Sequence, residues 1–247
     1  MSETHTFGDR PAAGGPQFTR AQLLYLWLAA FFSTCLIMAD IVGVKLFRVE
    51  VLGLSIEHTC GMLTFPLTFL ITDLVNEYYG KKATRRMTFI ALAMAVFAFV
   101  VLNVSQAMPY LPADYNVSEQ AFDEVLGSTK LMYVASLVAY LIAQLTDIAV
   151  FGFMKRLTGG KLLWLRATGS TVLSQVVDSL IVTTLYFQAK ALATGQAIPM
   201  STVLKLAATG YVLKFVLAVL VTPLIYAGHA VFRRVFGLVP LPPDEGA

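Results

Sequence analysis

The sequence predicts an all-α integral membrane protein with six transmembrane helices, and two observations lead to this class. The chain has 247 residues, of which 57% are hydrophobic and only 13% are charged, and its mean hydropathy is +0.71. Soluble domains carry about 25% charged residues. The apolar residues also gather in long runs, and a run of about 20 is what an α-helix needs to cross a bilayer. Backbone groups in lipid must be hydrogen-bonded within their own segment, so each run is expected to be a helix.

Six runs have this length, at residues 22–44, 60–79, 87–108, 131–153, 167–188 and 203–230. The polar, Pro/Gly-rich stretch before them is typical of a disordered segment. No linker interrupts the spans. We therefore expect a disordered cytoplasmic tail at 1–20, a single six-helix transmembrane domain at 21–236 and a second cytoplasmic tail at 237–247.

The connecting segments alternate in charge, which predicts the orientation of the chain. Basic residues follow the second run in "GKKATRR", the fourth in "KRLTGGKLLWLR" and the sixth at Arg233 and Arg234. The segment 109–130 is acidic instead. Lys and Arg near span ends stay on the cytoplasmic side. Both termini are therefore expected inside, as an even number of spans requires.

Two connecting segments have patterns of their own. The stretch "KLFRVEVLGLSIEHT" alternates like a strand around Gly53, which predicts a short external hairpin or a re-entrant flap over a cavity. The stretch 118–127 reads as a short interfacial helix that is capped by Ser118 and ends at Gly127.

Polar residues within the predicted spans are candidate functional residues. An ionisable group in a span costs at least ~2.5 kcal/mol and usually faces a cavity or a partner. Residues three and four apart share one face of a helix, and that spacing recurs here, twice as a Q-x-x-D pair. A repeat of this kind is expected where antiparallel helices line one cavity. The candidates are Asp73, Asn76 and Glu77 in the second span, Gln144 and Asp147 in the fourth, Gln175 and Asp178 in the fifth, and Lys214 in the sixth.

Several of these residues also have a structural explanation, which the sequence leaves open. Glu77 could pair with Lys81 at the basic turn. Asp73 could cap its helix or pair with the arginines of that turn. The two glutamines could join neighbouring helices, and Lys214 could neutralise Asp178. The mid-span depth of Asp178, about 18 Å along the helix from Arg166, favours a cavity.

The candidate residues suit a planar ligand rich in N–H donors. A carboxylate accepts strong charge-assisted bonds from adjacent N–H groups, such as those on a guanine-like edge, and an amide suits a neighbouring carbonyl. Phe65 and Phe69 precede Asp73 and could stack such a ring or pack in the core. No metal or other cofactor is expected, because the histidines are scattered and the two cysteines form no framework. The sequence has no HExxH or GxSxG motif, so an enzyme is not expected.

The chain resembles the queuosine precursor transporter family, also called the vitamin uptake transporter family. The resemblance covers about residues 22–232 and lies in "FPLTFLITDLVNEYYGKKATRR", "STKLMYVASLVAYLIAQLTDIAVF", "STVLSQVVDSLI" and "YVLKFVLAVLVTPLIY". It implies a multi-pass carrier of the bacterial inner membrane that imports 7-cyano- or 7-aminomethyl-7-deazaguanine. The implied substrate site includes Asp73, Glu77, Gln144, Asp147, Gln175, Asp178 and Lys214.

One departure from the family pattern concerns the first span. That span usually ends in a run like "SNIIAVK", and here it reads "ADIVGVK", so that Asp40 replaces an amide and Lys45 is kept. We add both residues to the candidate substrate site. The carboxylate of Asp40 puts the identity or charge of the substrate in doubt.

The expected partners are a nucleobase-like small molecule and the lipid bilayer. No nucleic acid is expected, because no base-reading module is visible. A homodimer is compatible with the sequence. The chain is also similar to the six-helix substrate-binding subunits of energy-coupling-factor vitamin transporters, and the alternative is such a subunit working with an ATPase.

Overall fold

The computed structural model of the chain is almost entirely helical. It describes residues 18–43, 45–51, 54–127, 130–195 and 198–242. Along the chain these form α1 (Arg20–Val42), β1 (Leu46–Val51), β2 (Leu54–Thr59), the 3-10 helix η1 (Cys60–Leu63), α2 (Phe65–Ala107), α3 (Glu119–Gly127), α4 (Lys130–Leu157), α5 (Leu163–Thr194) and α6 (Met200–Arg234). The helical membrane class is confirmed, because five helical segments are long and apolar enough to cross a bilayer. The predicted turn at Gly53, most of the predicted N-terminal tail and residues 243–247 lie outside the described part.

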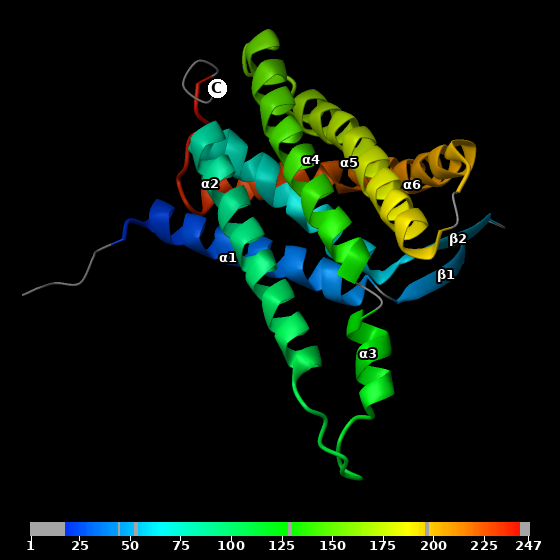
Figure 1. Cartoon of the computed structure of the whole chain (residues 1–247). Coiled ribbons are helices and arrows are strands. Elements are labelled where there is room, and N and C mark those ends of the chain that lie inside the picture. Colours follow the sequence, from blue (N-terminus) through cyan, green and yellow to red (C-terminus); the bar gives the residue numbers. More distant parts are fainter. Residues whose placement is uncertain (1–17, 44, 52–53, 128–129, 196–197, 243–247) are drawn as a thin grey trace, which may run out of the picture.

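The second and third predicted spans are joined in one long element, α2. The chain leaves helical geometry inside it at Gly80, where φ is 78° and ψ is 171°. Side chains with a Cβ rarely adopt this conformation, which is essentially restricted to glycine. Figure 1 shows the chain changing direction sharply in this part of α2. The break falls within the predicted basic turn, so residues 65–79 and 81–107 act as separate helical arms.

A hairpin and a short helix are found where the two shorter elements were predicted. Strands β1 and β2 form an antiparallel hairpin in which Leu46 pairs with Thr59 and Val51 with Leu54. Helix α3 begins directly after Ser118, whose hydroxyl accepts a hydrogen bond from the N–H of Ala121 at 3.2 Å. That bond is the expected N-cap.

Small apolar clusters join the helices, and large apolar side chains cover the outside. Phe32, Val75 and Tyr133 help to hold α1, α2 and α4 together. Tyr78 and Phe232 join α2 to α6. Many other large apolar side chains are exposed on the helices, which is the surface expected of helices in lipid.

Two ends of the bundle are used as landmarks below. The hairpin end carries β1 and β2, at the right of Figure 1. The basic end carries the bend within α2, the turn between α4 and α5, and the C-terminal segment that follows α6.

Candidate functional site

A band of buried polar side chains lies where α2, α4 and α5 meet. The Nε2 of Gln144 on α4 donates to the hydroxyl of Thr72 on α2 at 3.0 Å. The hydroxyl of Ser174 on α5 donates to Asp147 on α4 at 3.2 Å. We call this group the polar band; it consists of Thr72, Asp73, Asn76, Gln144, Asp147, Ser174 and Gln175, all of them buried. The structure therefore places five of the residues predicted from sequence, Asp73, Asn76, Gln144, Asp147 and Gln175, in this buried band.

Several atoms of the polar band have no hydrogen-bond partner in the described structure. They are both carboxylate oxygens of Asp73, both polar atoms of the Asn76 amide, one oxygen of Asp147 and the amide oxygen of Gln175. Asp73 is close enough to Asp147, Glu77 and Arg166 to interact with their charges. A buried polar group without a partner is costly. Such a group is expected where a ligand supplies the missing partner.

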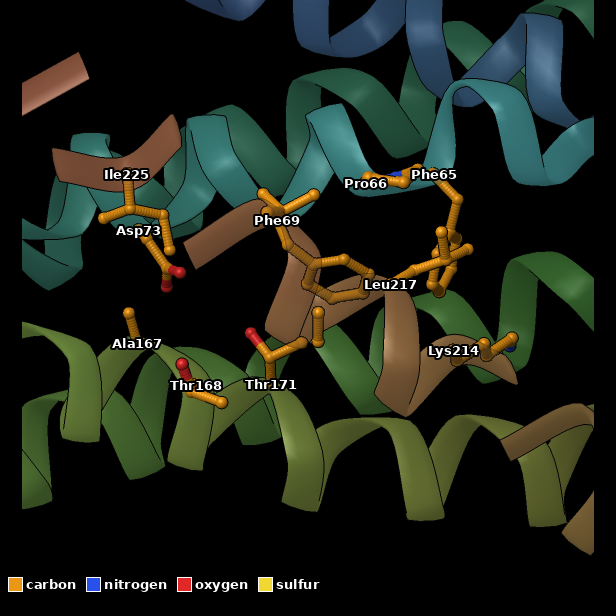
Figure 2. A pocket seen from close by; sticks show the side chains of 12 residues that line it. Phe65, Pro66, Phe69, Asp73, Ala167, Thr168, Thr171, Lys214, Leu217 and Ile225 are labelled. Atoms are coloured by element: carbon orange, nitrogen blue, oxygen red, sulfur yellow. The ribbon is translucent and has the colours of Figure 1, made fainter. Parts of the chain in front are cut away.

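A small cavity runs from Asp73 toward the hairpin end, between α2, α5 and α6 (Figure 2). Phe65 and Phe69 line it and pack edge to face, with ring centroids 4.7 Å apart. Thr171 and Leu217 face them from the other helices. Its volume is about 10 Å³, roughly the room for a single water molecule. This cavity is closed to anything as large as a nucleobase.

An ion pair closes the cavity on the hairpin side. Lys214 on α6 donates to the carboxylate of Asp178 on α5. The same ammonium lies 4.7 Å from the centre of the Phe65 ring, a cation–π distance. Lys214 therefore neutralises Asp178, which is the structural explanation that the sequence offered for this lysine. Phe65, which lines the cavity, thus contacts the ion pair directly.

The two candidates from the first span take different places. Asp40 near the end of α1 accepts a hydrogen bond from the hydroxyl of Ser136 on α4 at 2.8 Å. Its carboxylate is also close enough to Asp178 for the two charges to interact. Lys45 has an exposed side chain at the start of the hairpin. Its backbone N–H donates to the carbonyl of Val42 at 3.2 Å, and its carbonyl accepts from the N–H of Cys60 at 2.8 Å. Asp40 therefore lies near the Asp178–Lys214 pair, whereas the side chain of Lys45 is exposed.

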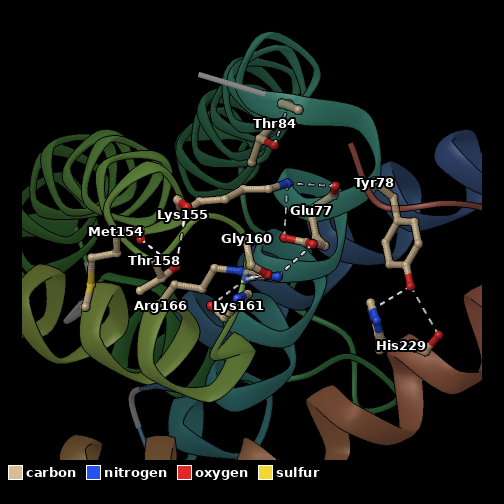
Figure 3. A network of polar contacts seen from close by, with 11 residues as sticks. Glu77, Tyr78, Thr84, Met154, Lys155, Thr158, Gly160, Lys161, Arg166 and His229 are labelled. Atoms are coloured by element: carbon tan, nitrogen blue, oxygen red, sulfur yellow. Dashed lines mark hydrogen bonds and ion pairs between the residues drawn. The ribbon is translucent and has the colours of Figure 1, made fainter. Parts of the chain in front are cut away.

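Glu77 belongs to a separate ionic cluster at the basic end. Its carboxylate lies 2.7 Å from Nη2 of Arg166 on α5 and 3.2 Å from Nζ of Lys155 on α4 (Figure 3). All three side chains are buried. We call Glu77, Lys155 and Arg166 the ionic cluster. Glu77 thus pairs with cations on two other helices, and the pairing with Lys81 considered from sequence is replaced by these contacts.

Sequence reasoning missed Lys155 and Arg166 as inward-facing residues. Their positions in a basic connecting segment suggested solvent-exposed loop charges. In the structure α4 continues to Leu157 and α5 begins at Leu163, so both residues are on helices. Arg166 also donates to the carbonyls of Gly160 and Lys161, at 2.7 and 3.1 Å, and so secures the turn between the two helices.

No group of His, Cys, Asp or Glu side chains in the described residues is arranged to hold a metal ion. The polar band presents carboxylates and amides, without the clustered imidazoles or thiolates typical of transition-metal sites. Its chemistry is that of hydrogen-bond recognition.

Comparisons with known proteins place the chain in a family. Residues 59–228, most of the chain, match the family described as "Putative vitamin uptake transporter". The chain is 28% identical over 206 residues to the "Probable queuosine precursor transporter" of Bacillus subtilis (strain 168), covering 83% of this chain and 82% of the relative. It is 27% identical over 154 residues to the "Queuosine precursor transporter" of Escherichia coli (strain K12), covering 62% and 64% of the two chains.

No solved structure matches the chain. The family match covers both halves of α2, the polar band, the ionic cluster and most of α6. The resemblance inferred from the sequence motifs is confirmed, and the family is one of transporters rather than enzymes. The chain therefore belongs to the vitamin uptake transporter family, as a multi-pass membrane protein built to move a small molecule.

Proposed function

We propose that the protein imports a queuosine precursor, 7-cyano-7-deazaguanine or 7-aminomethyl-7-deazaguanine, across the bacterial inner membrane. The names of the Bacillus and Escherichia relatives support this class of substrate. The observation that carries the proposal is the unpartnered carboxylate of Asp73, buried in the middle of the bundle beside the equally unpartnered amide of Asn76.

The chemistry of a deazaguanine matches these unpartnered atoms. Its guanine-like edge presents ring N–H and amino donors next to each other, and the two oxygens of Asp73 can accept both. Bonds of this kind to a charged acceptor are about twice as strong as neutral ones. The amide of Asn76 both donates and accepts, so it suits the adjacent carbonyl of the base. Gln175 adds another free acceptor nearby on α5.

Entry of the base requires the hairpin end to open. The cavity beside Asp73 holds about one water in its present shape. Phe65 and Phe69 fill its walls, and the Asp178–Lys214 pair lies across its outer side. Movement of these four side chains would free room for the ring, with the phenylalanines then stacking on it. The structure corresponds to a closed state of the carrier.

The proposed topology has six spans with both termini in the cytoplasm. A straight helix of 43 residues would be about 65 Å long, twice the thickness of the hydrocarbon core. The break at Gly80 lets α2 cross the membrane twice instead. The basic turn that follows Gly80 then lies inside, as the distribution of Lys and Arg predicts.

We further propose that the protein is a secondary carrier driven by protons. The neighbouring carboxylates of Asp73 and Asp147 are groups that can carry a proton through a membrane. The alternative is a substrate-binding subunit that needs an ATPase. Purified protein in liposomes distinguishes the two, because uptake without any ATPase excludes the subunit model, and uptake that ignores an imposed pH gradient excludes proton coupling.

The experiment that tests the substrate uses cells that cannot make queuosine precursors and lack their own importer. Expression of the wild-type chain should restore queuosine in tRNA when a nanomolar precursor is supplied. Asp73→Asn should fail to restore it at equal expression, whereas Asp123→Asn, at an exposed position on α3, should behave like the wild type. Absence of rescue by the well-expressed wild-type chain would refute the proposed substrate.

A further inference from the structure

Two cavities lie in line along one face of α2, and the ionic cluster separates them. The first is the small cavity beside Asp73 described above. The second, of about 430 Å³, lies at the basic end and is lined by Glu77, Lys155, Arg166, His229, Pro240 and Leu241 among others. Asp73 and Glu77 are four residues apart, which places them one turn apart on the same helix face. Adjacent residues of α5 also divide the two spaces, because Ala167 lines the first and Arg166 the second.

The ionic cluster ties three helices together at this boundary. Charge-assisted bonds from Lys155 and Arg166 to Glu77 join α4 and α5 to α2. If the two cations moved away from Glu77, the smaller cavity would open into the larger one. The cluster is therefore positioned as a barrier on the path from the polar band to the basic end.

The C-terminal segment also contacts α2 at Glu77. After α6 the chain turns at Gly237, which has a φ of 65°, and Leu238 packs against the apolar cluster of Leu74, Tyr78 and Phe232. The backbone N–H of Leu241 then donates to the carbonyl of Glu77 at 3.0 Å. Helical geometry fails three residues later, so this carbonyl lies near a helix end, where outside donors can reach it.

The same carbonyl receives a second donor, Nζ of Lys155, at 3.3 Å. Glu77 is thus held through its side chain by the ionic cluster and through its backbone by Lys155 and the C-terminal segment. The segment also covers part of the larger cavity with Pro240 and Leu241. Figure 1 shows it, in red, running beside α2 at the basic end.

We propose that Lys155, Arg166 and the segment 236–242 form the inner gate of the carrier, with Glu77 as its common anchor. In the present structure the gate is closed, and the larger cavity is the chamber through which the substrate leaves. This proposal rests on the proposed function only in that a substrate passes through the bundle. It assigns positioning roles to Lys155, Arg166 and Leu241, which act on access to the polar band rather than on the ligand itself.

The test measures access to the smaller cavity without any substrate. Thr171, buried in the wall of that cavity, is replaced by cysteine in a chain whose Cys35 and Cys60 are changed to serine. A membrane-impermeant maleimide is applied to the basic side in vesicles of defined orientation. Leu241→Pro removes the N–H that reaches Glu77 together with the leucine side chain. Leu241→Ala removes the side chain but keeps that N–H, so it serves as the matched control.

Leu241→Pro should speed labelling at position 171 by about five- to tenfold, the shift in an open–closed equilibrium that one lost hydrogen bond produces. Leu241→Ala should label at the wild-type rate. Equal rates in all three proteins would overturn the gate, and so would an equal increase in both variants. If Leu241→Pro does not fold, Lys155→Met removes both the second donor to the same carbonyl and one ion pair of Glu77, and it should give an increase at least as large. A Lys155→Met protein that folds and labels at the wild-type rate would also overturn the proposal.

The outcome is independent of the substrate. A failed tRNA rescue with accelerated labelling would refute the proposed substrate and leave the gate standing. Normal rescue with unchanged labelling would refute the gate and leave the proposed substrate standing.

Discussion

The carboxylate of Glu77 lies 2.7 Å from the guanidinium of Arg166, although the two residues are 89 positions apart in the chain. Both side chains are almost fully buried, and Lys155 adds a second cation at 3.2 Å. Charges taken out of water require close partners to offset the lost hydration. This contact fixes the relative positions of α2 and α5 at the basic end of the bundle.

Neutralising Glu77 should destabilise the protein strongly. Glu77→Gln leaves two buried cations without a counter-charge, and breaking a buried pair in this way costs about 3–5 kcal/mol. The midpoint of thermal unfolding in detergent should therefore fall clearly. Glu119→Gln, at an exposed position on α3, is the control and should change it little. Similar midpoints for the two variants would contradict a structural role of the ionic cluster.

Neutralising Asp73 should abolish uptake without lowering the stability of the protein. Its carboxylate has no hydrogen-bond partner to lose, so Asp73→Asn should leave the unfolding midpoint unchanged or raise it. Uptake and ligand-induced stabilisation by a deazaguanine should both disappear, because the charged acceptor is gone. Stability and ligand stabilisation are both measured by thermal unfolding of the same purified protein, without and with the deazaguanine. Retained ligand stabilisation would show that Asp73 does not contact the substrate.

The Asp178–Lys214 pair should show strong coupling in a double-mutant cycle. Asp178→Asn and Lys214→Met each leave one charge without its partner in a site that is mostly buried. The double variant leaves neither charge, so it should be more stable than the two single effects added together predict. Residues in direct contact show coupling of about 0.5–3 kcal/mol. Additive effects on the unfolding free energy would mean that the pair contributes nothing to stability.

The break in α2 should depend on the absence of a side chain at Gly80. Gly80→Ala places a Cβ in a backbone conformation that is essentially restricted to glycine, at a cost of about 1–3 kcal/mol. Gly152→Ala is a matched control, because a Cβ there meets nothing within 4 Å in a regular helix. The control should be neutral or slightly stabilising. Equal unfolding midpoints for the two variants would argue against a fixed turn at Gly80.

The hairpin should loosen in mild acid because of His58. Burial, with the nearby positive charge of Lys214, lowers the pKa of His58 below its usual value of about 6.5. A lowered pKa means that the folded state favours the neutral ring, so its contribution is full above about pH 6.5 and is lost as the pH falls through the folded value. The fall in unfolding midpoint between pH 7.5 and 5 should be smaller in His58→Gln than in the wild type. An equal fall would assign the pH dependence to other groups.

The class of the protein and most of its local structure follow from the sequence. Long apolar runs can only satisfy their backbone in lipid as helices, so the spans could be located from composition. The cap at Ser118 and the alternation around Gly53 predicted α3 and the hairpin because both depend on neighbours in the chain. The i, i+3 and i, i+4 spacings correctly placed Asp73 and Asn76 on one buried face of α2.

The sequence did not determine which charges meet. Lys155 and Arg166 were assigned to a basic loop, and their contacts with Glu77 depend on how far α4 and α5 extend and how each helix is rotated. Partners 78 and 89 residues apart are brought together only by helix packing. By itself the sequence determined the helices and the polar faces of α2, α4 and α5. Only the tertiary structure decided that Glu77 is neutralised while Asp73, one turn away, is not, because pairing depends on distances between helices that no spacing within a helix contains.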